Sequence, residues 1–288
     1  MLSNMDIDKT ITKALGKSQN DVFLPYHLGH IIYKQLKKNS TALPQTNHYE
    51  ALIKNLTHSG ILNPINKLNA YTLLGGKPLE TNQLACQLDP FCYLSHFSAM
   101  DYHGLTNRLP TTLYITTPND SDWRTSAHSL MKKELHESYD EYLNQSFPHL
   151  TKQKFKELNT QPVHQFNASH QGAFIKPQGR NLRISSIGRT FLDMIRTPDL
   201  CGGIHHVIDA YEEHAEIYLQ AVIDEVNQHG TAIDKVRVGY ILEERCGLSD
   251  SQISSWEQYA QRGGSRKLDA SADFEPRWSE KWKISLNT

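Results

Sequence analysis

The stretch TNHYEALIKNLTHSGILNPINKLNAYTLLGG, residues 46–76, decides the expected fold of the first part of the chain. Its first half has apolar side chains at the spacing of one helix face, namely Tyr49, Leu52, Ile53 and Leu56. We expect Asn47 to cap this helix and Gly60 to end it in the left-handed conformation. The stretch therefore predicts an amphipathic helix with one packed face and one outward face.

A β-hairpin is expected directly after this helix. Residues 61–65 and 70–74 have the composition of short strands, and the polar segment 66–69 joins them. A helix followed by such a hairpin is typical of a winged helix-turn-helix, in which the helix enters the major groove of DNA and the hairpin touches phosphates. The alternative is a helix and hairpin that only pack against other parts of the protein. We favour double-stranded DNA as the partner.

Candidate DNA contacts come from this helix, its hairpin and the helix before it. Asn47, His48 and Lys54 lie off the apolar stripe, and asparagine suits adenine in the major groove. Lys67, at the tip of the hairpin, is a candidate phosphate contact. A helix over residues 25–37 is expected to end in three further phosphate candidates: Lys34, Lys37 and Lys38. Their other explanation is a cationic helix C-terminus that complements the helix dipole.

Composition and charge indicate a globular protein with an uneven charge distribution. The chain has 288 residues, a length that is enough for about two domains. Its composition is 38% hydrophobic and 21% charged, which is typical of a globular protein. The whole chain has a net charge of −1, but residues 1–80 hold nine lysines, no arginine and five acids, which gives +4. A basic first domain suits nucleic acid on one side of the protein.

The expected location is the cytoplasm. No apolar run approaches the roughly 18 residues of a membrane span, and the polar, acidic first residues do not resemble a signal peptide. The four cysteines show neither a CxxC pair nor ligand spacing with histidine, so we expect reduced thiols.

The glycine- and proline-containing segment 75–78 predicts a domain boundary. We expect a winged helix-turn-helix domain over residues 1–78 and a second domain over 79–288 that is helical from about residue 186. The predicted fold class is α+β, predominantly helical, with a small sheet in the second domain. Helices are expected at 95–103, 130–145, 152–158, 187–196, 204–214, 217–229, 234–245 and 251–259. Strands are expected at 111–117, 163–166, 173–175, 182–185 and 282–286.

Several segments of the second domain resemble the AbiEi family, antitoxins of type IV toxin–antitoxin and phage-defence systems. The likeness runs through YLSHFSAMDYHGLT (93–106), LYITTP (113–118), SSIGRTFLDMIRTPDLCGGIHHVIDAY (185–211), VGYILEERCGL (238–248), QRGGSRKLD (261–269) and EKWKISLN (280–287). The resemblance implies an N-terminal winged domain that binds inverted repeats at its own promoter and represses transcription. It also implies a C-terminal domain that counteracts a nucleotidyltransferase toxin without forming a stable complex with it.

Enzymatic chemistry is weakly indicated. The turn Gly263-Gly264-Ser265 followed by Asp273 and Glu275 resembles the start of a nucleotidyltransferase site, in which two acids hold a metal. Only thirteen residues follow Glu275, whereas that core needs further strands and a third acid. The histidines, including His205 and His206, do not group with a third ligand. We therefore predict no catalytic residue, no metal and no cofactor.

A basic segment near the C-terminus is a candidate contact for an anion or an acidic partner. Its residues are Arg262, Arg266 and Lys267, because arginine suits such groups; the alternative is a solvated loop. Arg189 and Asp193, four apart on an expected helix, are interpreted as structural support.

The function predicted from these observations is that of a DNA-binding antitoxin and autorepressor, either monomeric or a weak dimer that pairs on DNA. Two alternatives stay open. One is a metal-dependent nuclease or nucleotidyltransferase with a winged domain, and the other is a repressor that senses a ligand.

Overall fold

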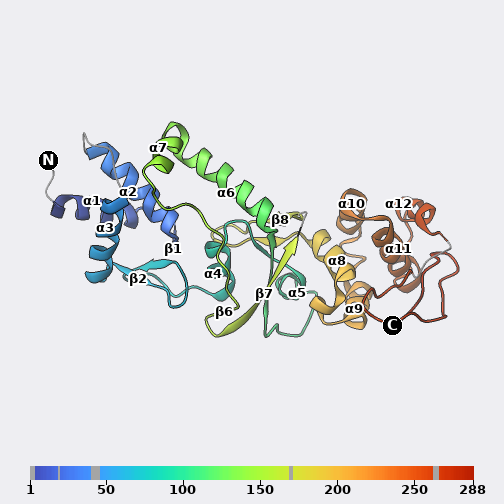
Figure 1. The fold of residues 1–288 in the computed structure, drawn as a ribbon. Coiled ribbons are helices and arrows are strands. Elements are labelled where there is room, and N and C mark those ends of the chain that lie inside the picture. The colour runs from blue at the N-terminus through green and yellow to red at the C-terminus, as the bar shows by residue number, and fades with distance from the viewer. Residues whose placement is uncertain (1–3, 19, 40–45, 169–170, 262–265) are drawn as a thin grey trace. The chain divides into compact units, whose positions relative to one another are not determined.

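The computed structural model describes residues 4–18, 20–39, 46–168, 171–261 and 266–288. The chain has an α+β fold that is mostly helical with small sheets, as predicted (Figure 1). It divides into two compact units, which are considered separately. The first unit comprises Met1–Cys92, Thr117–Thr160 and Asn167–Ser169, and the second comprises Tyr93–Thr116, Gln161–Phe166 and His170–Thr288. The first unit thus contains the expected 1–78 segment and adds chain from beyond it.

The first unit combines helices with a three-stranded antiparallel sheet. Its elements are α1 (Asn4–Gly16), β1 (Val22–Phe23), α2 (Pro25–Asn39), α3 (Thr46–His58), β2 (Leu62–Pro64), β3 (Tyr71–Leu73), α4 (Thr81–Leu88), α6 (Asp120–Leu135), η1 (His136–Ser138), α7 (Tyr139–Asn144) and β6 (Glu157–Leu158). The strand order is β1-β3-β2, with Phe23 opposite Tyr71 and Asn63 opposite Thr72. The sheet therefore joins the strand before α2 to the hairpin after α3.

Helix α3 ends as the sequence predicts but begins two residues earlier. Gly60 has a φ of +72°. Its N–H donates to the Thr57 carbonyl at 3.1 Å, while the Ile61 N–H donates to the Leu56 carbonyl at 2.9 Å. This pair of bonds is a Schellman ending. The prediction that Asn47 caps the helix is wrong, because the helix starts at Thr46 and Asn47 lies inside its first turn.

The predicted hairpin forms, with shorter strands than expected. β2 and β3 pair with Leu62 opposite Leu73, and the Ile65 N–H donates to the Ala70 carbonyl at 2.9 Å. The Leu68 N–H donates to the Ile65 carbonyl at 3.1 Å, which closes a turn whose third residue, Lys67, has a φ of +62°. A positive φ at that position is typical of a type II turn.

Helices α6 and α7 pack against α2 through tyrosines. The Tyr26 hydroxyl donates to Glu134 at 2.7 Å, and the Tyr33 hydroxyl donates to Glu141 at 2.5 Å. The ring of Tyr33 also lies 5.3 Å from the ring of Tyr142. These hydrogen bonds join residues that are 108 positions apart in the sequence.

Two expected helices in this part of the chain differ from the structure. The helix expected at 130–145 begins at Asp120, because Asn119 caps it by accepting from the Asp122 N–H at 2.9 Å, and a short 3₁₀ turn then separates α6 from α7. The helix expected at 152–158 is wrong, because residues 152–156 form no regular secondary structure and residues 157–158 form β6. Burial of Phe155 and Leu158 overrides the helix propensity of the intervening charged residues.

The second unit holds most of a six-stranded sheet and a group of helices. Its elements are β4 (Tyr93–Leu94), α5 (His96–Tyr102), β5 (Leu113–Pro118), β7 (Gln161–Ala168), β8 (Phe174–Ile175), β9 (Ile184–Ser185), α8 (Ile187–Arg196), η2 (Pro198–Cys201), α9 (Ile204–His214), α10 (Leu219–His229), α11 (Ala232–Tyr240), η3 (Ile241–Arg245), α12 (Ser251–Ser255) and η4 (Trp256–Tyr259). The sheet order is β6-β7-β5-β4-β9-β8. β4 pairs antiparallel with β5 and parallel with β9.

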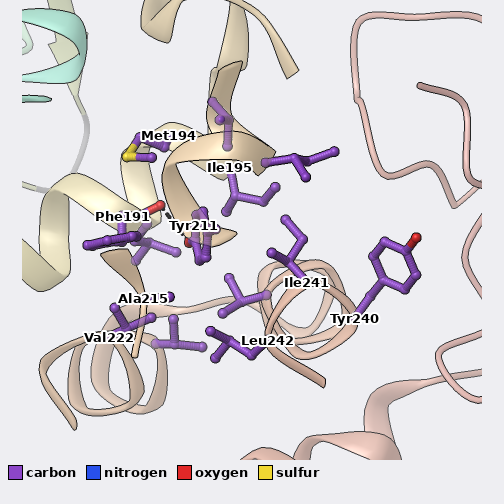
Figure 2. Packing of buried hydrophobic residues seen from close by; sticks show 14 of the residues in the cluster. Phe191, Met194, Ile195, Tyr211, Ala215, Val222, Tyr240, Ile241 and Leu242 are labelled. Atoms are coloured by element: carbon purple, nitrogen blue, oxygen red, sulfur yellow. Dashed lines mark hydrogen bonds between the residues drawn. The ribbon is translucent and has the colours of Figure 1, made fainter. Parts of the chain in front are cut away.

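The core of the second unit lies between α8, α9, α10 and α11, as Figure 2 shows. The Tyr211 hydroxyl donates to the Phe191 carbonyl at 2.8 Å, and the two rings lie 4.8 Å apart (Figure 2). The predicted cap of α8 is confirmed, because Ser186 accepts from the Arg189 N–H. No strand forms at 282–286; Ser285 instead makes isolated bridges to Lys267 and Trp278.

A buried charged group lies beside this core. Arg189 Nε donates to Asp193 Oδ1 at 2.7 Å, and its guanidinium lies 3.9 Å from Glu225 Oε1. Asp193 Oδ2 and Glu225 Oε1 are buried without a hydrogen-bond partner in the described residues. Burial raises the pKa of Asp193 to about 6, although the charge of Arg189 acts in the opposite direction. One guanidinium therefore faces two buried carboxylates.

Within the described residues, every helix is too short or too polar to cross a bilayer.

Candidate nucleic-acid interface

Helix α3 is packed on one face and exposed on the other. Leu52 and Leu56 are 7% and 1% exposed and belong to the core of the first unit. The exposed side chains of the helix are Asn47, His48, Glu50, Ala51, Lys54, Asn55 and His58. Three predicted DNA contacts of this helix therefore lie on its solvent-facing side.

The first turn of α3 is fixed against the segment that follows α7. Thr46 Oγ1 donates to the Ser146 carbonyl at 2.5 Å, and the rings of Tyr49 and Phe147 lie 6.2 Å apart. Burial raises the pKa of Tyr49 well above its ordinary value. The first turn of the helix is thereby held in a defined position.

Lys67 is exposed at the hairpin tip and forms no salt bridge with any described residue. Its φ of +62° is uncommon for a side chain other than glycine, asparagine or aspartate. An outlier of this kind motivates a functional hypothesis, and here a lysine replaces the glycine or asparagine that the turn would prefer.

The three lysines at the end of α2 have different surroundings. Lys34 and Lys38 are exposed without a salt bridge in the described residues. Lys37 Nζ instead lies 3.0 Å from Glu141 Oε2, donates to Ser138 Oγ at 3.1 Å, and has its pKa raised by the Glu141 contact. Its charge is already offset, so Lys37 is the weakest of the three as a phosphate contact.

A pocket beside the hairpin holds two lysines that the sequence analysis missed. It has a volume of about 520 Å³ and is lined in part by Lys67, Lys154 and Lys156. The two lysines were missed because residues 152–158 were expected to form a helix of the second domain. The available signal was the lysine at every second position from Lys152 to Lys156, which is not the spacing of one helix face.

The basic segment near the C-terminus holds its own loop together. Arg266 donates to the Tyr259 carbonyl at 2.5 Å, and Lys267 donates to the Ala272 carbonyl at 2.6 Å. Arg262 lies outside the described residues. Two of the three predicted anion contacts thus have their donors directed at backbone oxygens.

The acids considered for enzymatic chemistry are exposed and surrounded by irregular chain. Asp273 and Glu275 lie in a segment without a strand, and Asn287 Nδ2 donates to the Asp273 carbonyl at 2.9 Å. His206 accepts from or donates to Thr106 Oγ1 at 2.9 Å. Among the described residues, no group of three or more His, Cys, Asp or Glu side chains is arranged to hold a metal ion.

Comparisons with known proteins assign no family. No family model matches the chain, and no curated protein matches its sequence. Among solved structures, the chain is similar to the RV2827C protein from Mycobacterium tuberculosis, with a TM-score of 0.49 and 11% sequence identity over 97% of this chain and 90% of that one. A likeness of this degree carries no conclusion about function.

Proposed function

We propose that this protein binds duplex DNA through α3 and the β2–β3 hairpin, and that it regulates transcription. The observation that carries the proposal is that α3 buries only one face and exposes Asn47, His48 and Lys54 on the other. A helix of this kind enters the major groove with its N-terminal residues toward the base edges. Lysines then bind phosphates, and asparagine reads adenine.

The topology of the first unit supports a winged helix-turn-helix. α2 and α3 follow one another, the hairpin comes directly after α3, and the sheet order β1-β3-β2 attaches that hairpin to the strand before α2. In this proposal Lys67 touches the backbone beside the groove that α3 occupies. Lys34 and Lys38 are the remaining phosphate contacts, since Lys37 already has Glu141 as a partner.

The regulatory role that we propose is that of an AbiEi-type antitoxin and autorepressor, and it rests on the sequence resemblance of the second unit. In this role the protein represses its own promoter and counteracts a nucleotidyltransferase toxin encoded beside it. The protein itself would be no enzyme in this role and would need no cofactor.

DNA binding is tested with the full chain and a labelled duplex taken from upstream of its own gene. We expect the duplex to bind and the affinity to fall steeply between 50 and 200 mM salt, because bound lysines release counterions. A double variant, Lys54→Ala with Lys67→Asn, should weaken binding and reduce the slope of log K against log salt by about 0.9 for each phosphate that is no longer neutralised. Asparagine is chosen at position 67 because it tolerates a positive φ.

The matched control is Lys132→Ala with Lys133→Ala, which removes two exposed lysines from α6 and so changes the net charge equally. This control should bind like the parent. Equal weakening in both double variants would show that only overall charge matters, and the α3–hairpin assignment would be wrong.

The antitoxin role is tested by coexpressing the full chain with the nucleotidyltransferase encoded next to it. We expect the chain to restore growth, and we expect the Lys54→Ala, Lys67→Asn variant to restore it equally, because the counteracting function belongs to the second unit. Failure of the folded, abundant parent to restore growth would remove the antitoxin role while leaving DNA binding untouched.

A further inference from the structure

The pocket beside the hairpin tip combines cations with polar groups and has one acid. Its charged lining residues are Lys67, Lys154, Lys156 and Glu157, and Asn66, Asn159 and Thr160 add polar groups. Its volume of about 520 Å³ is within the range of ligand-binding pockets. It belongs entirely to the first unit. A site with three lysines and one glutamate favours an anionic ligand.

The lysines of this pocket differ from their neighbour Lys152, which has a carboxylate partner. Lys152 Nζ bonds to Asp120 Oδ1 at 2.9 Å and to the Pro118 carbonyl at 2.7 Å. The pKa of Asp120 is lowered mainly by Lys152 and only in smaller part by Lys154. Lys154 and Lys156 are exposed and form no salt bridge with the residues that the structure describes. Within that part of the chain, two positive charges beside the hairpin therefore lack an ion pair.

The backbone that presents these lysines is held on both sides. Phe155, between Lys154 and Lys156, is only 6% exposed, so the two flanking side chains project from an anchored residue. Asn159 Nδ2 donates to the Leu79 carbonyl at 3.0 Å and fixes the far end of the segment. Lys67 lines the pocket from the hairpin turn that the Leu68 N–H to Ile65 carbonyl hydrogen bond closes. The backbone positions that carry the three lysines are thus fixed before any ligand arrives.

We propose that this pocket is a second phosphate-binding site for duplex DNA, in which Lys154 and Lys156 act together with Lys67 on the sugar-phosphate backbone. The inference rests on the proposed DNA binding and extends its surface from the hairpin to residues 154–160. Lysine binds phosphate as a point charge and carries no base specificity. The site therefore strengthens binding to any sequence, while α3 selects among sequences.

The test measures binding of labelled duplexes by the full chain at several salt concentrations. The variant Lys154→Gln with Lys156→Gln should keep its fold and bind both the upstream duplex and an unrelated duplex more weakly. The slope of log K against log salt should fall by about 1.8, or 0.9 for each phosphate that the variant no longer neutralises. The charge-preserving variant Lys154→Arg with Lys156→Arg should bind like the parent, as should Lys132→Gln with Lys133→Gln.

The outcomes separate this site from the proposed function. If the parent binds DNA and the Lys154→Gln, Lys156→Gln variant keeps the parental slope, the second site is overturned while DNA binding stands. If the parent binds no duplex at any salt concentration, the proposed function itself fails. A third arm measures binding of a nucleoside triphosphate to the parent without DNA. Binding that these two substitutions abolish, together with an unchanged DNA slope, would assign the pocket to a free nucleotide and overturn the proposal.

Discussion

The two units differ in the type of their cationic side chains and in the contacts that these side chains make. In the first unit the cations are almost all lysines, and those at α3, at the hairpin and at 154–156 have no salt bridge in the described residues. In the second unit three arginines have fixed partners: Arg189 binds Asp193, Arg196 binds Asp234, and Arg237 donates to the Lys267 carbonyl. The planar guanidinium suits such fixed contacts, whereas a lysine on a flexible stem suits a phosphate met on binding. Whether a cation is available to a partner therefore depends on its salt bridges and hydrogen bonds. The number of cations in a unit does not show this.

The units also differ in what joins their helices. α2 of the first unit meets α6 and α7 through tyrosine hydroxyls and carboxylates. The second unit relies on a continuous aliphatic and aromatic core between α8 and α11. When a substitution adds an atom at a helix contact, a neighbouring side-chain end can shift more easily than neighbouring helix backbone can.

The largest effect should come from adding one methyl group where α8 meets α10. A Cβ at Gly188 would lie 2.2 Å from the Ala221 carbonyl oxygen, so the two helices must separate. We expect Gly188→Ala to lower the free energy of unfolding by about 3 kcal/mol. The matched change in the first unit is Gly29→Ala, whose Cβ would meet the Tyr142 hydroxyl at 2.6 Å. Tyr142 is buried and its hydroxyl donates to the Pro148 carbonyl at 2.7 Å, but a hydroxyl can shift further than helix backbone, so we expect a smaller decrease of about 2 kcal/mol there.

Both variants are measured by urea unfolding followed by circular dichroism and tryptophan fluorescence. Equal destabilisation by Gly188→Ala and Gly29→Ala would contradict the difference between the two kinds of helix contact.

A smaller effect is expected from the buried carboxylates, and it depends on pH. Burial raises the pKa of Asp193 to about 6 in the folded protein, against 3.8 for the ordinary carboxyl. Between these values the folded state binds more protons than the unfolded state, so this group makes the protein less stable as pH rises from about 4 to 6. Asp193→Asn removes the titration and keeps a side-chain oxygen for Arg189. Between pH 4 and pH 6.5 its stability relative to the parent should rise by roughly 2–3 kcal/mol.

The measurement is urea unfolding at pH 4, 5, 6 and 6.5, with fluorescence from Trp256, Trp278 and Trp282 reporting on the second unit. A difference between variant and parent that stays constant over this range would show that Asp193 titrates normally. Glu225→Gln serves as the comparison, since it leaves the closer ion pair intact.

The smallest effects concern the contact between α2 and α7. Tyr33→Phe removes a hydroxyl that donates to Glu141 but keeps the ring beside Tyr142, so we expect the free energy of unfolding to fall by about 1 kcal/mol. Lys37→Met removes the exposed end of the same network and should change stability by less than about 0.5 kcal/mol. It should also leave DNA affinity nearly unchanged, unlike Lys34→Met. A larger effect of Lys37→Met on either quantity would mean that this lysine is not neutralised by Glu141.

Local sequence signals predict much of the fold. The stripe from Tyr49 to Leu56 and the glycine after it give α3 and its ending, and Ser186 marks the start of α8. The start of α6 was missed although Asn119 and Asp122 have the spacing of a cap. Residues 152–156 are rich in lysine, which favours a helix, but they form none because Phe155 is buried against residues distant in the sequence.

The candidate site is less predictable than the fold, because pairing joins distant residues. Nothing near Lys37 in the sequence shows that Glu141, 104 positions later, offsets its charge. The same holds for Arg266 and Lys267, whose donors meet backbone oxygens of neighbouring turns. The sequence therefore shows where the cationic residues are. Only the tertiary structure shows which of them already have a partner within the protein.

The hydrogen bond from Thr46 to Ser146 and the tyrosine contacts of α2 have a consequence for how this protein can be cut or recombined. A fragment ending at residue 78 would lack the partners of Tyr26, Tyr33 and Tyr49 and would present their rings to water. A gene fusion that takes over the first unit must carry three separate stretches of coding sequence, namely residues 1–92, 117–160 and 167–169. Exchange of this unit between proteins by a single crossover is therefore disfavoured.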